Sequence, residues 1–205
     1  MNLTRKAQGF VMNNMSMEDA LPTRMPVYVN SMVYLFGVLT LSALAVVCLS
    51  GLIIAIFGPT WYHISPAGHF VNSLHFWSVQ VFFFGIVVHM IGKFFMAAWR
   101  DGRWRTWIGG LIALAIAVFT GLTGFIMQTD WDAQWISGQS KDAMNAMGMG
   151  WLNMFNIGQV MMLHILLFPV LLVAFVALHV IIVRHESPVK PIEDSRASRA
   201  GGRNE

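Results

Sequence analysis

Four long apolar stretches constrain the fold of this 205-residue chain more than any other feature. We expect helices over about residues 29–57, 71–99, 107–128 and 156–183. About 20 apolar residues are enough for a helix to cross a bilayer core roughly 30 Å thick. Hydrophobic residues make up 56% of the chain and charged residues only 11%, which excludes an ordinary soluble globular protein. The sequence therefore predicts an all-α membrane protein built as a bundle of four transmembrane helices.

Two of the predicted helices carry a pair of histidines each. In the second helix His75 is followed by His89 at position i+14, and in the fourth His164 is followed by His179 at i+15. In an ideal α-helix these intervals leave rotations of about −40° and about +60°, so each pair lies roughly on one face. A rise of about 1.5 Å per residue separates the members of a pair by roughly 21 Å. Each helix therefore offers one histidine towards either membrane surface.

If these two helices face each other, their histidines form two stacked sites, His75 with His164 and His89 with His179. Two imidazoles saturate a haem iron, which favours electron transfer over ligand binding. One histidine in an apolar helix is more often a hydrogen-bonded core residue, but four in this register indicate two bis-histidine haems. Cys48 is the single cysteine, so there is no Cys-x-x-Cys-His attachment and each haem would be held by coordination and packing alone.

Paired glycines in the other two helices repeat the i, i+14 interval. They are Gly37 with Gly51 in the first helix and Gly110 with Gly124 in the third. A glycine lets a flat macrocycle approach the backbone where a larger residue would collide. We therefore expect these four glycines to border the two haem sites at the same two depths.

The basic residues predict how the chain crosses the membrane. They gather before the first helix, in the turn 100–105, and after the fourth helix. Cytoplasmic loops carry an excess of Lys and Arg, so four crossings place both termini in the cytoplasm. His75 and His164 then form the outer level, and His89 and His179 the inner level. The same distribution, with a net charge of only +3, argues against nucleic-acid binding as a function.

The chain divides into three expected regions. Residues 1–25 form a polar cytoplasmic segment, 26–192 the dihaem four-helix domain, and 193–205 a charged, disordered tail. Residues 58–70 read as a loop without Lys, Arg, Asp or Glu, and 129–155 as the longest connection, with room for short helices. Pro169 should bend the fourth helix between the two haem levels.

Taken together, these features resemble the cytochrome b family of bc-type quinol oxidoreductases, and in particular its N-terminal, haem-carrying four-helix part in the split form. The resemblance covers roughly residues 26–192. It includes the paired histidines and glycines and Pro169. Three further stretches match: Pro26-Val27-Tyr28-Val29-Asn30, Trp107-Ile108-Gly109-Gly110 and His185-Glu186-Ser187-Pro188.

The resemblance implies a function and its partners. Two b haems, an outer one of lower potential and an inner one of higher potential, would carry electrons across a bacterial plasma membrane or an equivalent energy-transducing membrane. Electrons would pass between quinol or quinone and partner redox subunits. The implied partners are a separate membrane subunit equivalent to the cytochrome b C-terminal part, an iron–sulfur protein and a c-type cytochrome, in a dimeric complex. Arg184 and His185 are either a lipid-facing pair or part of an inner quinone site.

The sequence departs from the family pattern at the expected propionate and quinol positions. Asn72, Gln159 and Gly92 stand at or beside places where the family has arginines, with Lys93 one step later. The segment 127–132, Met-Gln-Thr-Asp-Trp-Asp, replaces the family's Leu-Pro-Trp-Asp. Two other readings therefore stay open. The chain could be a dihaem anchor of another quinone-linked enzyme, such as a nitrate reductase or a dehydrogenase, or, more remotely, a cofactor-free bundle.

Overall fold

The computed structural model describes residues 32–186 and residue 189, and within them the regular structure is entirely helical. Three unbroken long helices are α3 (Met32–Phe57), α5 (Pro66–Phe95) and α6 (Trp104–Ile126). A fourth, Ile157–His185, consists of α8 (Ile157–Met162), the π-helical turn η2 (Leu163–Leu167) and α9 (Phe168–His185). All four are long and apolar enough to cross a membrane, which confirms the predicted four-helix membrane fold. The regions predicted for 1–25 and 193–205 lie outside the described residues.

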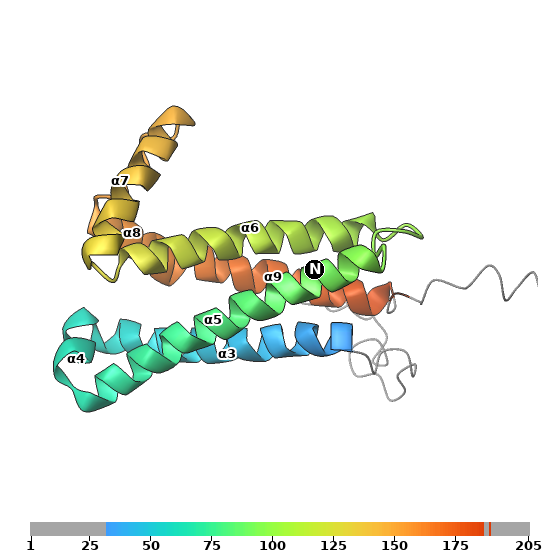
Figure 1. Ribbon diagram of the computed structural model, residues 1–205, viewed down its shortest axis with the longest axis horizontal. Helices are drawn as coiled ribbons and strands as arrows, with labels where there is room; N and C mark the ends of the chain where they lie inside the picture. The colour runs from blue at the N-terminus through green and yellow to red at the C-terminus, as the bar shows by residue number, and fades with distance from the viewer. Residues whose placement is uncertain (1–31, 187–188, 190–205) are drawn as a thin grey trace, which may run out of the picture.

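The four helices alternate in direction along the bundle (Figure 1). The turn between α5 and α6 lies at the same end as the beginning of α3 and the end of α9. Two shorter helices, α4 (Pro59–Ile64) and α7 (Trp131–Ala146), lie at the opposite end, and α7 projects away from the bundle. This is the arrangement that four successive crossings require.

The helices pack mainly as two pairs, α3 with α5 and α6 with α9. One buried apolar cluster draws residues from all four of these helices. Its members stand at or beside the midpoint between the two glycines or two histidines of their own helix: Ala43, Leu44, Phe82, Ala117 and Leu172. The shared core of the bundle therefore lies at mid-depth, between the two histidine levels.

The prediction of a loop over 58–70 was wrong in its extent. Gly58 turns the chain with φ of 80°, after which Pro59 begins the short helix α4. The Ser65 side chain then accepts a hydrogen bond from the Gly68 N–H at 3.4 Å, and Pro66 takes the first helical position of α5. Proline suits that position because its missing N–H is not needed there. Proline here starts helices, so α5 begins at Pro66 and not near Val71 as predicted.

The long connection 129–155 contains one substantial helix, α7. Asp130 caps it by accepting a hydrogen bond from the Ala133 N–H at 2.8 Å, as an N-cap aspartate does. The buried positions Ala133, Ser137 and Met144 recur at helical spacing along one face. Met144 joins a second apolar cluster that includes Ile126 at the end of α6. These contacts fasten α7 to the end of the bundle.

Pro169 alters the fourth helix through a π-helical turn. Proline cannot donate to the carbonyl four residues earlier, and its ring crowds that carbonyl. Just before it, the Phe168 N–H bonds the Leu163 carbonyl, an i to i−5 bond. A π turn of this kind adds one residue to an otherwise α-helical segment. The structure therefore has an inserted residue in Leu163–Leu167, around His164, and the predicted bend of the helix stays a prediction.

Candidate functional site

His75 of α5 and His164 of η2 face each other in the space between the α3–α5 pair and the pair formed by α6 and the fourth helix. Their ring centres are 6.4 Å apart and their planes are inclined at 88°. Imidazole–metal bonds are about 2.0–2.1 Å, and a ring nitrogen lies about 1.1 Å from the ring centre, so two ligands on opposite sides of one metal place their centres roughly 6.3 Å apart. The observed separation of 6.4 Å matches the separation calculated for two imidazoles that ligate one metal; the ligation itself stays a prediction.

Hydrogen-bond acceptors on α3 determine which nitrogen of His75 carries the proton. Its Nδ1 lies 3.1 Å from the Val47 carbonyl and 3.0 Å from Ser50 Oγ. The carbonyl can only accept, and the Ser50 hydroxyl already donates to the Val46 carbonyl at 2.7 Å. Nδ1 must therefore be the donor to both, which leaves the lone pair on Nε2. This is the tautomer that a metal-ligating histidine needs.

The same arrangement recurs at His164, whose hydrogen-bond acceptors lie on α6. Its Nδ1 lies 3.0 Å from the Thr120 carbonyl and 3.3 Å from Thr123 Oγ. The Thr123 hydroxyl itself donates to the carbonyls of Phe119 and Thr120, at 2.9 Å each. By the same reasoning Nδ1 of His164 is the donor, and its Nε2 carries a free lone pair. In both histidines of this level, which is the outer level in the predicted orientation, Nδ1 is therefore bonded to the helix packed beside the ring.

Each of the four paired glycines lies against one imidazole ring. The glycines of α3 contact the histidines of α5, and the glycines of α6 contact the histidines of the fourth helix. A Cβ added at any of these glycines would crowd that ring. The shortest distances would be 3.1 Å for Gly37 with His89, 3.0 Å for Gly51 with His75, 3.1 Å for Gly110 with His179, and 2.5 Å for Gly124 with His164. The glycines thus make room for the imidazoles themselves; that they also border a macrocycle stays a prediction.

The π turn explains why the two histidine intervals differ by one position. His164 lies inside Leu163–Leu167, where the backbone holds one residue more than an α-helix would. The i, i+15 interval from His164 to His179 therefore corresponds structurally to the i, i+14 interval from His75 to His89. Both pairs then match the spacing of the glycines.

The inner histidines, His89 and His179, lack the hydrogen bonds that hold the outer pair. Nδ1 of His89 and Nδ1 of His179 are buried, and neither makes a hydrogen bond of acceptable geometry. The carbonyls of Val33 and Thr106 approach them, in the places that Val47 and Thr120 take at the outer level. A cation, Lys93, lies close enough to interact electrostatically with both inner rings.

Lys93 is itself held in place by an aromatic ring. Its Nζ lies 3.3 Å from the centre of the Tyr34 ring, a cation–π contact. The Tyr34 hydroxyl donates to the Val189 carbonyl at 2.9 Å. The inner level therefore has a positioned positive charge next to its two histidines.

A cavity of about 540 Å³ opens at the outer level. Its walls include both outer histidines and their two glycines, with Tyr62, Asn72 and Gln128 among its polar residues. Its size falls within the roughly 300–1,000 Å³ typical of ligand and cofactor sites. Burial raises the pKa of Tyr62, so its phenol stays a neutral hydrogen-bond donor.

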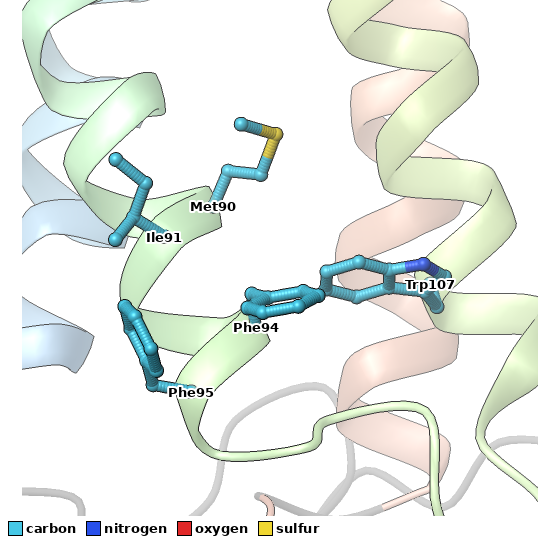
Figure 2. A pocket seen from close by; sticks show the side chains of 5 residues that line it. All are labelled: Met90, Ile91, Phe94, Phe95 and Trp107. Carbon is cyan, nitrogen blue, oxygen red and sulfur yellow. The ribbon is translucent and has the colours of Figure 1, made fainter.

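A second, smaller cavity of about 370 Å³ lies between α5 and α6 near the inner level. Figure 2 shows the rings of Phe94 and Trp107 meeting below Met90, with Ile91 and Phe95 on the same helix as Phe94. All five lining residues are apolar or aromatic. Met90 follows His89 in sequence, so this cavity adjoins the inner histidine level, although the histidines themselves do not line it.

The remaining predicted site residues lie at the ends of the bundle. Arg184 and His185 are exposed in the last turn of α9. Gln159 bonds the backbone of the preceding loop, accepting from the Asn153 N–H at 2.7 Å and donating to the Trp151 carbonyl at 3.1 Å. Its side chain is therefore engaged in holding the start of the fourth helix. The role of Arg184 and His185 at a quinone stays a prediction.

The donor set at each level consists of two imidazoles. Throughout the described residues, no group of three or more His, Cys, Asp or Glu side chains is placed to hold a metal ion. Two nitrogens alone leave an ion short of ligands, because protein-bound metals take four or more. A porphyrin would supply four further nitrogens, so the donor set fits haem and does not fit a bare ion.

Comparison with known families matches residues 80–201, more than half of the chain, to the family described as cytochrome b (N-terminal)/b6/petB. The chain belongs to this family. The matched region contains three of the four paired histidines, His89, His164 and His179, and both paired glycines of α6.

Individual relatives agree with the family. Cytochrome b6 of Heliobacterium mobile is 21% identical over 202 residues, covering 85% of this chain and 93% of that protein. The cytochrome b subunit of the cytochrome bc1 complex is 35% identical in Streptomyces coelicolor, over 31% of this chain and 12% of that one. The corresponding Mycobacterium tuberculosis subunit is 29% identical over 57% of this chain and 24% of that one. This chain therefore spans most of a cytochrome b6 but only a small part of the bc1 subunits.

A solved structure entitled "Hyperthermophilic respiratory Complex III" shares the fold. It superposes with a TM-score of 0.72 at 17% identity, over 93% of this chain and 56% of that one. The shared fold agrees with the family to which the sequence match assigns the chain.

Two residues of the site, Ser50 and Thr123, were not predicted from the sequence. Each precedes the outer glycine of its helix, Gly51 or Gly124, by one position. This shared position, one residue before a paired glycine, could have marked both residues in the sequence. A hydroxyl next to a glycine in an apolar helix ordinarily bonds its own backbone. Its additional contact with an imidazole is therefore visible only in the structure.

Proposed function

We propose that this chain is a dihaem b-type cytochrome subunit of a bc-type quinol oxidoreductase complex. His75 and His164 would ligate the outer haem, and His89 and His179 the inner haem. The single observation that carries the proposal is the outer pair, with its 6.4 Å separation and both Nδ1 atoms committed to hydrogen bonds. The remaining nitrogen of each ring is then the ligand for a metal between them.

The chain's own residues suit a bound haem at both levels. The four glycines Gly37, Gly51, Gly110 and Gly124 let each imidazole sit close to the neighbouring helix, which leaves the space between the helix pairs to the macrocycle. When bound, a haem b with two imidazole ligands supplies an iron that accepts and releases one electron without an open coordination position. The residues hold it in place, exclude water and set its potential.

The haem propionates need polar partners in this apolar environment. At the outer cavity the phenol of Tyr62 and the amides of Asn72 and Gln128 are the candidates, which take the part that arginines play elsewhere in the family. At the inner level the ammonium of Lys93 lies beside both ligands. We therefore assign neutral donors to the outer haem and a cation to the inner one.

The two levels together would conduct electrons across the membrane. A separation of about 21 Å along the helices covers much of a roughly 30 Å bilayer core. The mid-depth core around Phe82 keeps the levels apart and water out. In this scheme, electrons from quinol enter at the outer haem and leave to quinone from the inner haem, near Arg184 and His185.

The proposed setting follows the charge pattern and the relatives. The basic turn with Arg100, Arg103 and Arg105 would be cytoplasmic, and so would both termini. The partners would be a membrane subunit equivalent to the C-terminal part of cytochrome b, an iron–sulfur protein and a c-type cytochrome, in a dimeric complex. Cytochrome b6 of Heliobacterium, which this chain matches over nearly its whole length, supports a split arrangement of this kind.

The deciding experiment is purification of the complex with its haem content and subunit composition. We expect two non-covalent haems b per chain and a reduced-minus-oxidised b-type band. Replacing His75 and His164 together with alanine should remove one haem and leave the other. Replacing the exposed His63 and His69 in the same way should leave both, which controls for the loss of any two outer histidines. A colourless preparation would overturn the proposal.

The identity of the co-purified subunits separates the complex proposed here from other quinone-linked enzymes. An iron–sulfur protein and a c-type cytochrome would support the bc-type complex. A large catalytic subunit of a nitrate reductase or a dehydrogenase in their place would show instead that the chain is a dihaem anchor.

A further inference from the structure

Building on the proposed dihaem function, we infer that Ser50 and Thr123 lower the reduction potential of the outer haem relative to the inner haem. The two hydroxyls would act through His75 and His164, as positioning residues that never touch the iron.

At the outer level, each ligand donates one N–H to two acceptors on the neighbouring helix. His75 Nδ1 lies 3.0 Å from Ser50 Oγ, and His164 Nδ1 lies 3.3 Å from Thr123 Oγ. Each hydroxyl donates its own hydrogen to a helix carbonyl, to Val46 at 2.7 Å and to Phe119 at 2.9 Å. Their lone pairs are therefore left for the imidazoles, and towards the imidazoles the hydroxyls act only as acceptors.

At the inner level, the equivalent positions hold no hydroxyl. The i, i+14 repeat that relates the two levels pairs Ser50 with Phe36 and Thr123 with Gly109. Neither Phe36 nor Gly109 has a side chain that can accept a hydrogen bond. In agreement with this, the Nδ1 atoms of His89 and His179 are both buried without a hydrogen bond of acceptable geometry. The two levels thus have the same arrangement of histidines and glycines, but only the outer level has the two hydroxyl acceptors of Ser50 and Thr123.

The difference has a direct electronic consequence. A hydrogen bond accepted from Nδ1–H makes the imidazole more basic, and a more basic ligand gives more charge to the iron. The ferric state gains most from that charge, so its stabilisation lowers the reduction potential. The outer haem, with two extra acceptors, therefore holds an electron less tightly than the inner haem. Electron movement from the outer to the inner level is then downhill.

The first test removes the hydroxyls. In the purified complex, Ser50→Ala and Thr123→Val should each raise the outer midpoint potential in a redox titration, and the double variant should raise it most. We expect up to about a tenfold change in the equilibrium constant for reduction, which is about 59 mV for a one-electron couple. The inner potential should not move. Haem content per chain, measured alongside, checks that both variants still fold and load.

The second test adds a hydroxyl at the inner level. A Cβ at Gly109 would lie 3.8 Å from His179 Nδ1 with no tighter contact, so Gly109→Ser places an acceptor in the position that Thr123 takes at the outer level. We expect Gly109→Ser to lower the inner potential. Gly109→Ala is the matched control, with the Cβ but without the oxygen, and should leave the potential near that of the natural protein.

These outcomes separate the inference from the proposed function. A complex without haem would overturn the proposed function and the inference together. If both haems are bound and the outer reduction potential does not change in Ser50→Ala and Thr123→Val, the inference alone is overturned. A potential that moved equally in Gly109→Ser and Gly109→Ala would show that bulk, and not hydrogen bonding, controls it, and would also overturn the inference.

Discussion

The planes of His75 and His164 are nearly perpendicular, at 88°, with ring centres 6.4 Å apart. The angle follows from the different helices to which they are fastened. The His75 ring is oriented by its hydrogen bonds to α3, and the His164 ring by those to α6. Neither ring can turn to become parallel with the other without losing these bonds. The outer site therefore imposes a fixed angle on any metal that the rings ligate.

This angle predicts a spectroscopic signature for the outer haem. Each imidazole splits the iron d orbitals along its own plane, and two perpendicular planes nearly cancel each other's splitting. The oxidised outer haem should therefore give a low-spin electron paramagnetic resonance signal with one large g value and weak remaining features. The signal should vanish in the His75→Ala and His164→Ala double variant. A strongly rhombic spectrum from this haem would contradict the perpendicular arrangement.

The glycine contacts predict a graded loss of haem. An added Cβ would come within 2.5 Å of the His164 ring at Gly124, but only within 3.1 Å of the His89 ring at Gly37. Gly124→Ala should therefore displace its histidine and deplete the outer haem, while Gly37→Ala should retain most of the inner haem. Pyridine haemochrome content per chain, with the two potentials to identify which haem is lost, measures the effect.

Gly138 in α7 supplies the matched control for the glycine series. A Cβ there would lie 3.8 Å from the Phe155 ring, an ordinary contact. Gly138→Ala should keep both haems and should add a little helix stability, because alanine is favoured over glycine by about 1 kcal/mol in a helix interior. If Gly138→Ala lost as much haem as Gly124→Ala, the loss would reflect general misfolding and not the imidazole contact.

The π turn predicts that one deletion is tolerated in the fourth helix. Leu166 lies in the turn with an exposed side chain. Deleting Leu166 would let this segment become an ordinary α-helix, in which His164 and His179 are separated by the same interval as His75 and His89 in α5. We expect both haems to be retained, with at most a modest shift of the outer potential. Haem content and redox titration of the purified variant test this.

The corresponding deletion in α5 is the control. Phe84 is also exposed, but it stands in a regular α-helix between His75 and His89. Its removal rotates one histidine by about 100° relative to the other. We expect this variant to lose at least one haem. Equal tolerance of the two deletions would mean that the π turn is not what aligns the histidine pairs.

The sequence predicted the large features because they repeat. The four apolar stretches, the interval from His75 to His89 and the equal intervals of the glycines all follow from helix geometry. The sequence gives no reason for the extra residue between His164 and His179, since a π turn has no signature of its own apart from Pro169. Its structural meaning appears only once the backbone is known.

Other features depended on neighbours that a single chain does not reveal. The segment 58–70 was predicted as a loop, although Pro59 and Pro66 each begin a helix within it, because the sequence alone does not say on which side of a proline the helix lies. The hydroxyls of Ser50 and Thr123 each donate a hydrogen bond to a carbonyl of their own helix. Their contact with an imidazole depends on how α3 meets α5 and how α6 meets the fourth helix.

The mid-depth core predicts where the bundle itself is most sensitive. Leu172 is 4% exposed and packs with Phe82 and Ala117 between the two histidine levels, whereas Val170, two positions earlier, is 60% exposed. Leu172→Ala should destabilise the bundle by about 2–5 kcal/mol, the usual cost of emptying a buried leucine site, and Val170→Ala should change little. The temperature at which the detergent-solubilised protein loses its b-type absorbance measures both. Because this core joins all four long helices, Leu172→Ala should release both haems at one lowered temperature. Loss of only one haem would show that the two levels are stabilised independently.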